Sequence, residues 1–259
     1  MQQILALTPS RLAAVRGLHT TLAHVAYRIG GDGRLWAASL PPEIRGGWMM
    51  LEEPETAPIS RPESAAKEIV RECIRRRFAG VIADFEAPPT RDRAALLRLI
   101  GQQLPQGLQL WVPETFGSAS PRSVVLISTA ISGGSLHQRL EEAIRRWGVR
   151  RVALDGVRLR MDFTLPAPSG EGQPLCAEEF SRLRQGQPVY FSPELCARYF
   201  TYRSVSQVHF VLFDDAETLR RKAQTGASLG LEKILYMLPE VEDLLDALFT
   251  EKQKPYPKV

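Results

Sequence analysis

The sequence predicts an α/β protein in which strands and helices alternate, with a closed (β/α)8 TIM barrel as the favoured architecture. Short apolar, β-branched segments recur along the chain, helical patterns lie between several of them, and the apolar segments number eight. The strand count by itself leaves an open, doubly wound sheet as the alternative. With 259 residues and 44% hydrophobic side chains, the chain can bury the core of one large domain.

The expected strands are short segments bounded by polar or turn-forming residues. They are residues 3–7, 22–29, 48–51, 80–85, 109–112, 124–128, 151–154 and 233–237. Helical periodicity predicts four long helices, at residues 62–77, 90–103, 135–147 and 216–229. The first of these opens with Pro-Glu-Ser and the last is followed by Gly230, which are typical helix boundaries.

One region between the seventh and eighth strands interrupts this alternation. Residues 188–191, 198–202 and 207–213 are rich in aromatic residues or alternate apolar with polar ones, which indicates a small antiparallel sheet. We expect it to be an insertion, at about residues 164–213, in a single domain that spans residues 1–250. Residues 251–259 are polar with two prolines and are expected to form a loose tail.

Charge and cysteine content argue against several classes of protein. The 33 basic and 29 acidic residues are scattered, without the basic patch that is typical of nucleic-acid-binding proteins. Cys73, Cys176 and Cys196 have no metal-ligand spacing and leave an odd thiol, so we expect buried, unreactive thiols and no disulfide framework. We expect no metal, cofactor or membrane contact, because no ligand motif and no membrane-spanning apolar run occurs.

The strongest chemical signal lies at residues 78–86, where an apolar strand ends in two carboxylates. Side chains alternate along a strand, so Asp84 and Glu86 point to the same side, which faces the reaction site at the C-terminal mouth of a barrel. Two acids so close do not ionise with equal ease, and one proton can be retained near neutral pH for donation to a leaving group. The alternative is a strand end with two solvated acids.

Residues 79–86 resemble the Asp-x-x-Asp-x-Asp-x-Glu motif on the fourth strand of glycoside hydrolase family 18, with Gly80, Asp84, Phe85 and Glu86 retained. Further segments are similar to the spore-associated members of that family, which are N-acetylglucosaminidases acting on peptidoglycan and spore cortex. These segments are Met161-Asp162-Phe163-Thr164-Leu165-Pro166, Tyr199-Phe200-Thr201-Tyr202, residues 209–219, and residues 22–27 with Asp32-Gly33. The resemblance runs from the second strand to the eighth and is strongest in the last third of the chain.

The resemblance implies specific roles for the two acids. In family 18 the glutamate protonates the glycosidic oxygen, and the aspartate two residues before it orients the N-acetyl group whose carbonyl oxygen attacks the anomeric carbon. This substrate-assisted route needs no protein nucleophile. Glu86 and Asp84 match these catalytic positions.

Three departures from the family pattern also affect the expected site. Ile82 replaces the polar residue that tunes the following aspartate, so the local charge balance must differ. Residues 127–130, Ile-Ser-Thr-Ala, stand where the family has Met-x-Tyr-Asp, whose tyrosine holds the N-acetyl group. Met237 takes the place of the tryptophan that forms the floor under the sugar.

Four other residues are candidates for substrate binding. Tyr27 and Trp48 are placed near strand ends and are expected to stack on a sugar, with a core position as the alternative. Glu114, after the fifth strand, is either a cleft acid or a solvated loop residue. Asp162 is either a polar wall of the cleft or a structural residue, as its family counterpart also is.

Two function hypotheses follow. The first is a retaining hydrolase of β-linked N-acetylglucosamine polymers, peptidoglycan or chitin-like, and the second is a catalytically inactive barrel that binds a glycan or a protein. The retained Asp84 and Glu86 favour catalysis, whereas the lost tyrosine and tryptophan favour binding alone. The N-terminus shows no signal-peptide pattern, which is compatible with a cytoplasmic or spore-associated protein. The sequence does not indicate an oligomeric state.

Overall fold

The computed structural model describes residues 1–38, 40–54, 58–167, 170–204 and 207–249. Eight parallel strands form a closed ring in which β1 pairs with both β14 and β2. The predicted TIM barrel is therefore confirmed, and the open sheet is excluded. In ring order the strands are β1 (Gln2–Leu7), β14 (Lys233–Met237), β8 (Val152–Asp155), β7 (Val124–Ser128), β6 (Gln109–Pro113), β5 (Gly80–Asp84), β4 (Trp48–Glu52) and β2 (Thr21–Ile29), with β3 (Leu35–Ala37) antiparallel to β2.

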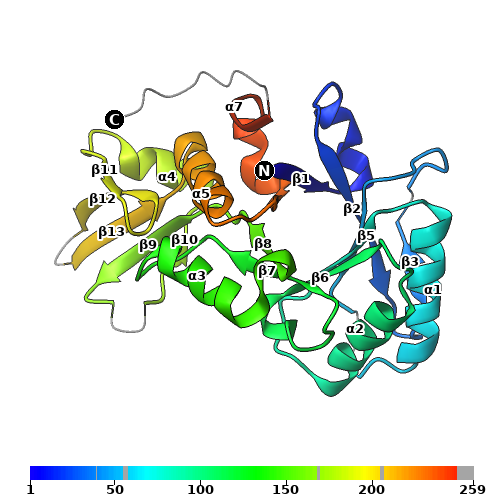
Figure 1. Ribbon diagram of the computed structural model, residues 1–259. Helices are drawn as coiled ribbons and strands as arrows, with labels where there is room; N and C mark the ends of the chain where they lie inside the picture. The colour runs from blue at the N-terminus through cyan, green and yellow to red at the C-terminus, as the bar shows by residue number, and fades with distance from the viewer. Residues whose placement is uncertain (39, 55–57, 168–169, 205–206, 250–259) are drawn as a thin grey trace.

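The helices cover the outside of this barrel, and the four predicted long helices are all present (Figure 1). In the described part of the chain, none is long and apolar enough to cross a bilayer. The long ones are α1 (Pro62–Arg75), α2 (Arg91–Gln103), α3 (Leu136–Trp147) and α5 (Ala216–Ser228). The shorter ones are η1 (Pro9–Val15), η2 (Glu114–Phe116), η3 (Val149–Arg151), α6 (Leu238–Val241), η4 (Glu242–Leu244) and α7 (Leu245–Phe249).

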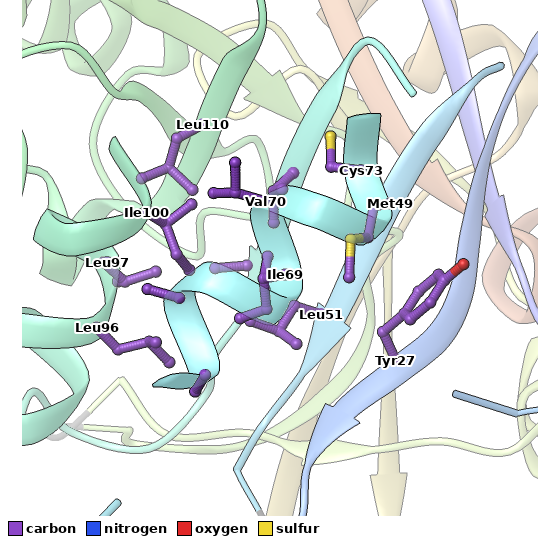
Figure 2. Packing of buried hydrophobic residues seen from close by; sticks show 14 of the residues in the cluster. Tyr27, Met49, Leu51, Ile69, Val70, Cys73, Leu96, Leu97, Ile100 and Leu110 are labelled. Carbon is purple, nitrogen blue, oxygen red and sulfur yellow. The ribbon is translucent and has the colours of Figure 1, made fainter. Parts of the chain in front are cut away.

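The core has two layers, because residues along each barrel strand alternate between the outer and the inner face. The outer layer packs the strands against the helices, and Figure 2 shows part of it, where Met49 and Leu51 of β4 meet Ile69 of α1. The inner layer fills the barrel with side chains from all eight strands. Its members are Ile4, Ala6, Ala23, Val25, Trp48, Met50, Ile82, Trp111, Val124, Leu126, Ala153, Leu235 and Met237.

A second, antiparallel sheet lies between β8 and β14 in the chain, beside the barrel on the side away from α1 and α2 (Figure 1). Its order is β10 (Gln173–Pro174), β9 (Arg160–Leu165), β13 (Gln207–Phe213), β12 (Ala197–Ser204) and β11 (Tyr190–Ser192), with α4 (Ala177–Arg184) packed on one face. The predicted antiparallel segments are confirmed. The sheet also contains β9 and β10, which were not predicted, and therefore begins ahead of residue 164.

A buried ion pair joins this sheet to α5. Lys222 Nζ lies 2.6 Å from Asp214 Oδ2, and both side chains are fully buried. Asp214 also accepts hydrogen bonds from the backbone N–H of Leu159 at 2.9 Å and from the hydroxyl of Thr218 at 2.8 Å. The carboxylate thus links the chain that enters β9 to the first turns of α5.

The cysteine prediction is only partly correct. Cys73 and Cys196 are buried, but Cys176 is exposed. The reason is its position as the N-cap of α4, where its sulfur accepts the backbone N–H of Glu179 at 3.4 Å.

Candidate active site

The mouth of the barrel is lined by the last inward-facing residues of several of its strands. On β5 the inner-layer residue is Ile82 and the next inward residue is Asp84; on β8, Ala153 is followed in the same way by Asp155. The last residues of β4, β7 and β14 are Glu52, Ser128 and Met237, and they face inward in the same way. A set of carboxyl groups therefore lies directly above an apolar core.

Asp84 and Glu86 lie at the end of the barrel that the sequence predicts. Asp84 is the last residue of β5 and is partly buried, whereas Glu86 follows the strand and is exposed. Glu53, after β4, contacts both ends of the loop that joins β5 to α2. It accepts the backbone N–H of Ala87 at 3.1 Å and lies 2.6 Å from Nε of Arg93. The exposed carboxyl of Glu86 can contact a bound ligand and exchange protons with water.

Burial is the largest cause of a raised pKa at Asp84, and the charges of Glu86, Glu52 and Glu53 raise it further, to about 6. Asp155 has a pKa raised to about 7 by burial and by the charges of Glu240 and Asp84. The two carboxyls with raised pKa values, Asp84 and Asp155, are therefore partly buried, whereas the predicted donor Glu86 is exposed. The sequence indicated a retained proton at residues 84–86 but missed the contribution of Asp155 and Glu240.

This site predicts a pH dependence of stability. Since native Asp84 binds its proton more tightly than the unfolded chain does, its contribution to the free energy of unfolding falls as pH rises through about 6. Asp84→Asn removes this titration and is expected to raise the free energy of unfolding at pH 8 by about 3 kcal/mol, because each unit of pKa shift corresponds to about 1.4 kcal/mol. At pH 4.5 the gain in the free energy of unfolding should fall to about a third of its value at pH 8. Urea unfolding of both proteins at the two pH values measures this, and an equal difference at both would contradict the assignment.

Tyr27 does not reach the mouth, so its prediction as a sugar-stacking residue is wrong. The β2 strand shifts register between Val25 and Tyr27, and this bulge turns Tyr27 to the outer face. Its ring is fully buried in the layer shown in Figure 2, and its hydroxyl donates to Glu72 Oε1 of α1 at 3.2 Å.

Tyr27→Phe should therefore lower the stability of the protein without altering the mouth of the barrel. Removing the hydroxyl leaves Glu72 with its arginine partners Arg75 and Arg76, so a loss of about 1 kcal/mol in the free energy of unfolding is expected. Thermal or urea unfolding measures the loss. Affinity for N-acetylglucosamine oligomers should be the same as in the wild type, and a tenfold weaker affinity would place Tyr27 in the binding site after all.

Trp48 faces the barrel interior but at the wrong end for the predicted role. It is the first residue of β4, so it lies at the N-terminal end, away from Glu86. Its ring packs 4.7 Å from that of Trp111, and Lys233 Nζ lies 5.6 Å from both ring centres. A cavity of about 520 Å³, lined in part by Trp111 and Lys233, opens at this same end.

The last two predicted binding residues have protein partners. Glu114 follows β6 and pairs with Arg139 of α3, whose guanidinium donates to Glu114 Oε2 at 2.7 Å. Asp162 lies on β9, opposite Val211, on the face that α4 covers. It accepts the hydroxyl of Tyr202 at 2.6 Å and lies 3.0 Å from Nδ1 of His209. Neither carboxylate is among the charges that shift the pKa of Asp84.

No protein-family model and no curated protein matches the sequence. Several solved structures of other proteins are similar to the structure of this chain. The spore cortex-lytic enzyme SleL of Bacillus megaterium is 16% identical with a TM-score of 0.64, over 98% of this chain and 75% of that chain. A chitinase of Chromobacterium violaceum is 19% identical with a TM-score of 0.67, over 96% and 97% of the two chains.

A glycoside hydrolase family 18 chitinase of Cycas revoluta, solved in complex with (GlcNAc)3, is 12% identical with a TM-score of 0.63, over 96% and 97% of the two chains. These similarities cover almost the whole of this chain, including the second sheet. The predicted family 18-like, chitinase-like fold is therefore confirmed. At these identities the similarity establishes the fold alone.

Proposed function

We propose that this protein hydrolyses β-linked N-acetylglucosamine polymers slowly, by a substrate-assisted retaining mechanism, with Glu86 as the catalytic acid. The observation that carries the proposal is the pair of carboxyls at the C-terminal end of β5, with Asp84 in the mouth and Glu86 exposed beside it. Structures with this fold include a chitinase in complex with (GlcNAc)3 and spore cortex-lytic enzymes. The substrate is accordingly chitin-like or peptidoglycan.

In the proposed reaction each carboxyl has a separate role. Above the pKa of about 6, Asp84 is mostly ionised and can accept the N–H of the substrate's N-acetyl group, which directs its carbonyl oxygen to the anomeric carbon. Glu86 donates a proton to the leaving glycosidic oxygen. Water then opens the cyclic intermediate, while Glu86 takes a proton back.

A slow rate follows from the composition of the mouth. The last inward-facing residues of β4, β5, β7, β8 and β14 are Glu52, Asp84, Ser128, Asp155 and Met237, and none of them is aromatic. These five positions therefore offer no aromatic ring on which a sugar could stack. Weaker positioning lowers the rate even when the proton donor is present.

The same observation favours the second candidate function, a barrel that binds a glycan without turnover. One experiment separates the two. Wild-type protein is incubated with (GlcNAc)4, (GlcNAc)6 and purified peptidoglycan, products are measured by mass spectrometry, and binding is measured by calorimetry. The proposal predicts binding and slow release of shorter oligomers. Binding without products supports the second function, and the absence of both refutes the two together.

A further inference from the structure

An exposed tryptophan lies on the short strand β3, which pairs antiparallel with the end of β2. Trp36 is 57% exposed, more than any other large hydrophobic side chain in the part of the chain that the structure describes. Two other tryptophans, Trp48 and Trp111, are buried inside the barrel. Single exposed rings are common on protein surfaces, so the position of Trp36 decides what it can do.

The strand β3 extends the wall of the barrel at the end where the candidate site lies. β1 pairs with the first four residues of β2, and β3 pairs with its last three residues, on the edge that does not pair with β4. β3 therefore continues the ring beyond the end of β1. Because β2 ends at the C-terminal end of the barrel, this is also the end at which Asp84 and Glu86 lie.

The side chain of Trp36 lies on the inner face of this wall. Tyr27 and Ile29 belong to the outer layer, so Arg28 between them lies on the opposite, inner face. Arg28 is paired directly with Trp36, and directly opposed residues of an antiparallel pair share one face. Leu35, the neighbour of Trp36 on β3, packs against the outer layer, which agrees with this assignment.

The strand registers place Trp36 in one row with Asp84. Asp84 of β5 is paired with Glu52 of β4, the register of β2 against β4 brings Arg28 beside Glu52, and Arg28 is paired with Trp36. Neighbouring strands lie about 4.8 Å apart, so the row from Asp84 to Trp36 is about 14 Å long. Successive sugars of a β-1,4-linked chain advance by a similar length, so a sugar about three units from the one at Asp84 reaches Trp36.

The indole ring of Trp36 is held in a fixed orientation. Its N–H donates to Asp32 Oδ1 at 3.4 Å, and the ring packs on Gly30, where even a Cβ atom would collide with it. Leu35 donates its backbone N–H to Glu68 of α1 at 2.9 Å, which ties β3 to the outside of the barrel. A ring that is already held in place loses little conformational entropy when a ligand binds to it.

We propose that Trp36 is a stacking platform for an outer sugar of the bound glycan, at the end of the row that begins at Asp84. The inference rests on the proposed function for its ligand, a β-linked N-acetylglucosamine polymer. The apolar face of a pyranose ring matches the exposed indole, and stacking removes both surfaces from water. Trp36 thus supplies the aromatic contact that the strand ends around Asp84 do not offer.

The test is the affinity for (GlcNAc)6, measured by calorimetry. Trp36→Ala should weaken binding about tenfold or more. Trp36→Phe keeps an aromatic ring but loses the hydrogen bond to Asp32, so it should retain most of the affinity. Tyr190→Ala is the control, because it removes an exposed aromatic ring on the second sheet, and it should bind as the wild type does. If Trp36→Ala binds (GlcNAc)6 as tightly as the wild type, the inference is wrong.

Tryptophan fluorescence of the wild type gives a second measurement that does not depend on a variant folding. Because Trp36 is exposed in the free protein, a sugar stacked on it should shift the emission to shorter wavelength. The buried Trp48 and Trp111 should not respond. An unchanged emission spectrum at saturating (GlcNAc)6 would contradict the inference.

Chain length and turnover separate this inference from the proposed function. If the protein hydrolyses the oligomers, Trp36→Ala should lower kcat/KM for (GlcNAc)6 but not for (GlcNAc)2, which is too short to reach from Asp84 to Trp36. Binding that depends on Trp36 without turnover would support the inference and refute hydrolysis. Hydrolysis of (GlcNAc)6 that is independent of Trp36 would do the reverse, and the absence of any binding would refute both.

Discussion

Glu86→Gln is expected to lower the rate of hydrolysis of N-acetylglucosamine oligomers by about 10² to 10⁴-fold. Glutamine keeps the size and polarity of the side chain but has no proton to give to the leaving oxygen. Because Glu86 is exposed, the substitution should leave the fold and the free energy of unfolding nearly unchanged. Affinity for the oligomers should also be retained, since the lost step follows binding.

The measurement is release of a chromogenic group from N-acetylglucosamine oligomers by wild type and variant at equal concentration. Glu142→Gln is the matched control, because it makes the same change at an exposed position on α3. Its rate should equal that of the wild type. Activity that survives in Glu86→Gln would assign the proton donor to another residue.

Lys222→Met is expected to reduce the free energy of unfolding by about 3 to 5 kcal/mol. The substitution leaves the carboxylate of Asp214 buried without its cation, at a site where both side chains are fully buried. The two remaining hydrogen bonds, from Leu159 and Thr218, do not neutralise its charge. The loss should appear in urea unfolding as a lower midpoint.

Two further variants identify the cause of that loss. Gln224→Met, at an exposed position on the same helix, should change stability by less than about 0.5 kcal/mol. Adding Asp214→Asn to Lys222→Met removes the unpaired charge and should recover part of the stability. If Lys222→Met costs less than about 1 kcal/mol, the pair does not hold the second sheet to α5 as described.

Local signals in the sequence were sufficient to predict the strands, whereas the family resemblance was needed to favour a closed barrel over an open sheet. Each strand is a short apolar run, and most of the predicted boundaries agree with the structure within one or two residues, as at 124–128 and 233–237. The strand β9 was missed although Met161, Phe163 and Leu165 alternate with polar residues, because its sequence was interpreted only as a family motif. The two-residue strand β10 has no local signal, since its pairing with β9 alone defines it.

The position of the candidate site was predictable where its residues lie on one segment of the chain. Asp84 and Glu86 lie on one segment, so alternation alone places them together. Asp155 and Glu240 come close to Asp84 only when the barrel closes, and no spacing in the sequence carries that information. An acid at the end of an apolar strand, Val-Ala-Leu-Asp, was nevertheless available as a signal for Asp155.

The aromatic predictions failed for two different physical reasons. Tyr27 follows a β-bulge, which reverses the face that simple alternation predicts. Trp48 faces the interior, but it begins its strand, so it belongs to the end of the barrel opposite the acids. Alternation predicts the face of the sheet on which a side chain lies, whereas the boundaries of the strand determine the end of the barrel at which it lies.

The most direct test of the central claim is a crystal structure of Glu86→Gln in complex with (GlcNAc)3. The substitution slows turnover, so an intact ligand can be observed. We predict that the trisaccharide lies in the mouth of the barrel, with an N-acetyl group within hydrogen-bonding distance of Asp84 and a glycosidic oxygen beside residue 86. A trisaccharide bound at the N-terminal cavity, on the second sheet or nowhere at saturating concentration would contradict the claim that these carboxyls form a glycan-hydrolysing site.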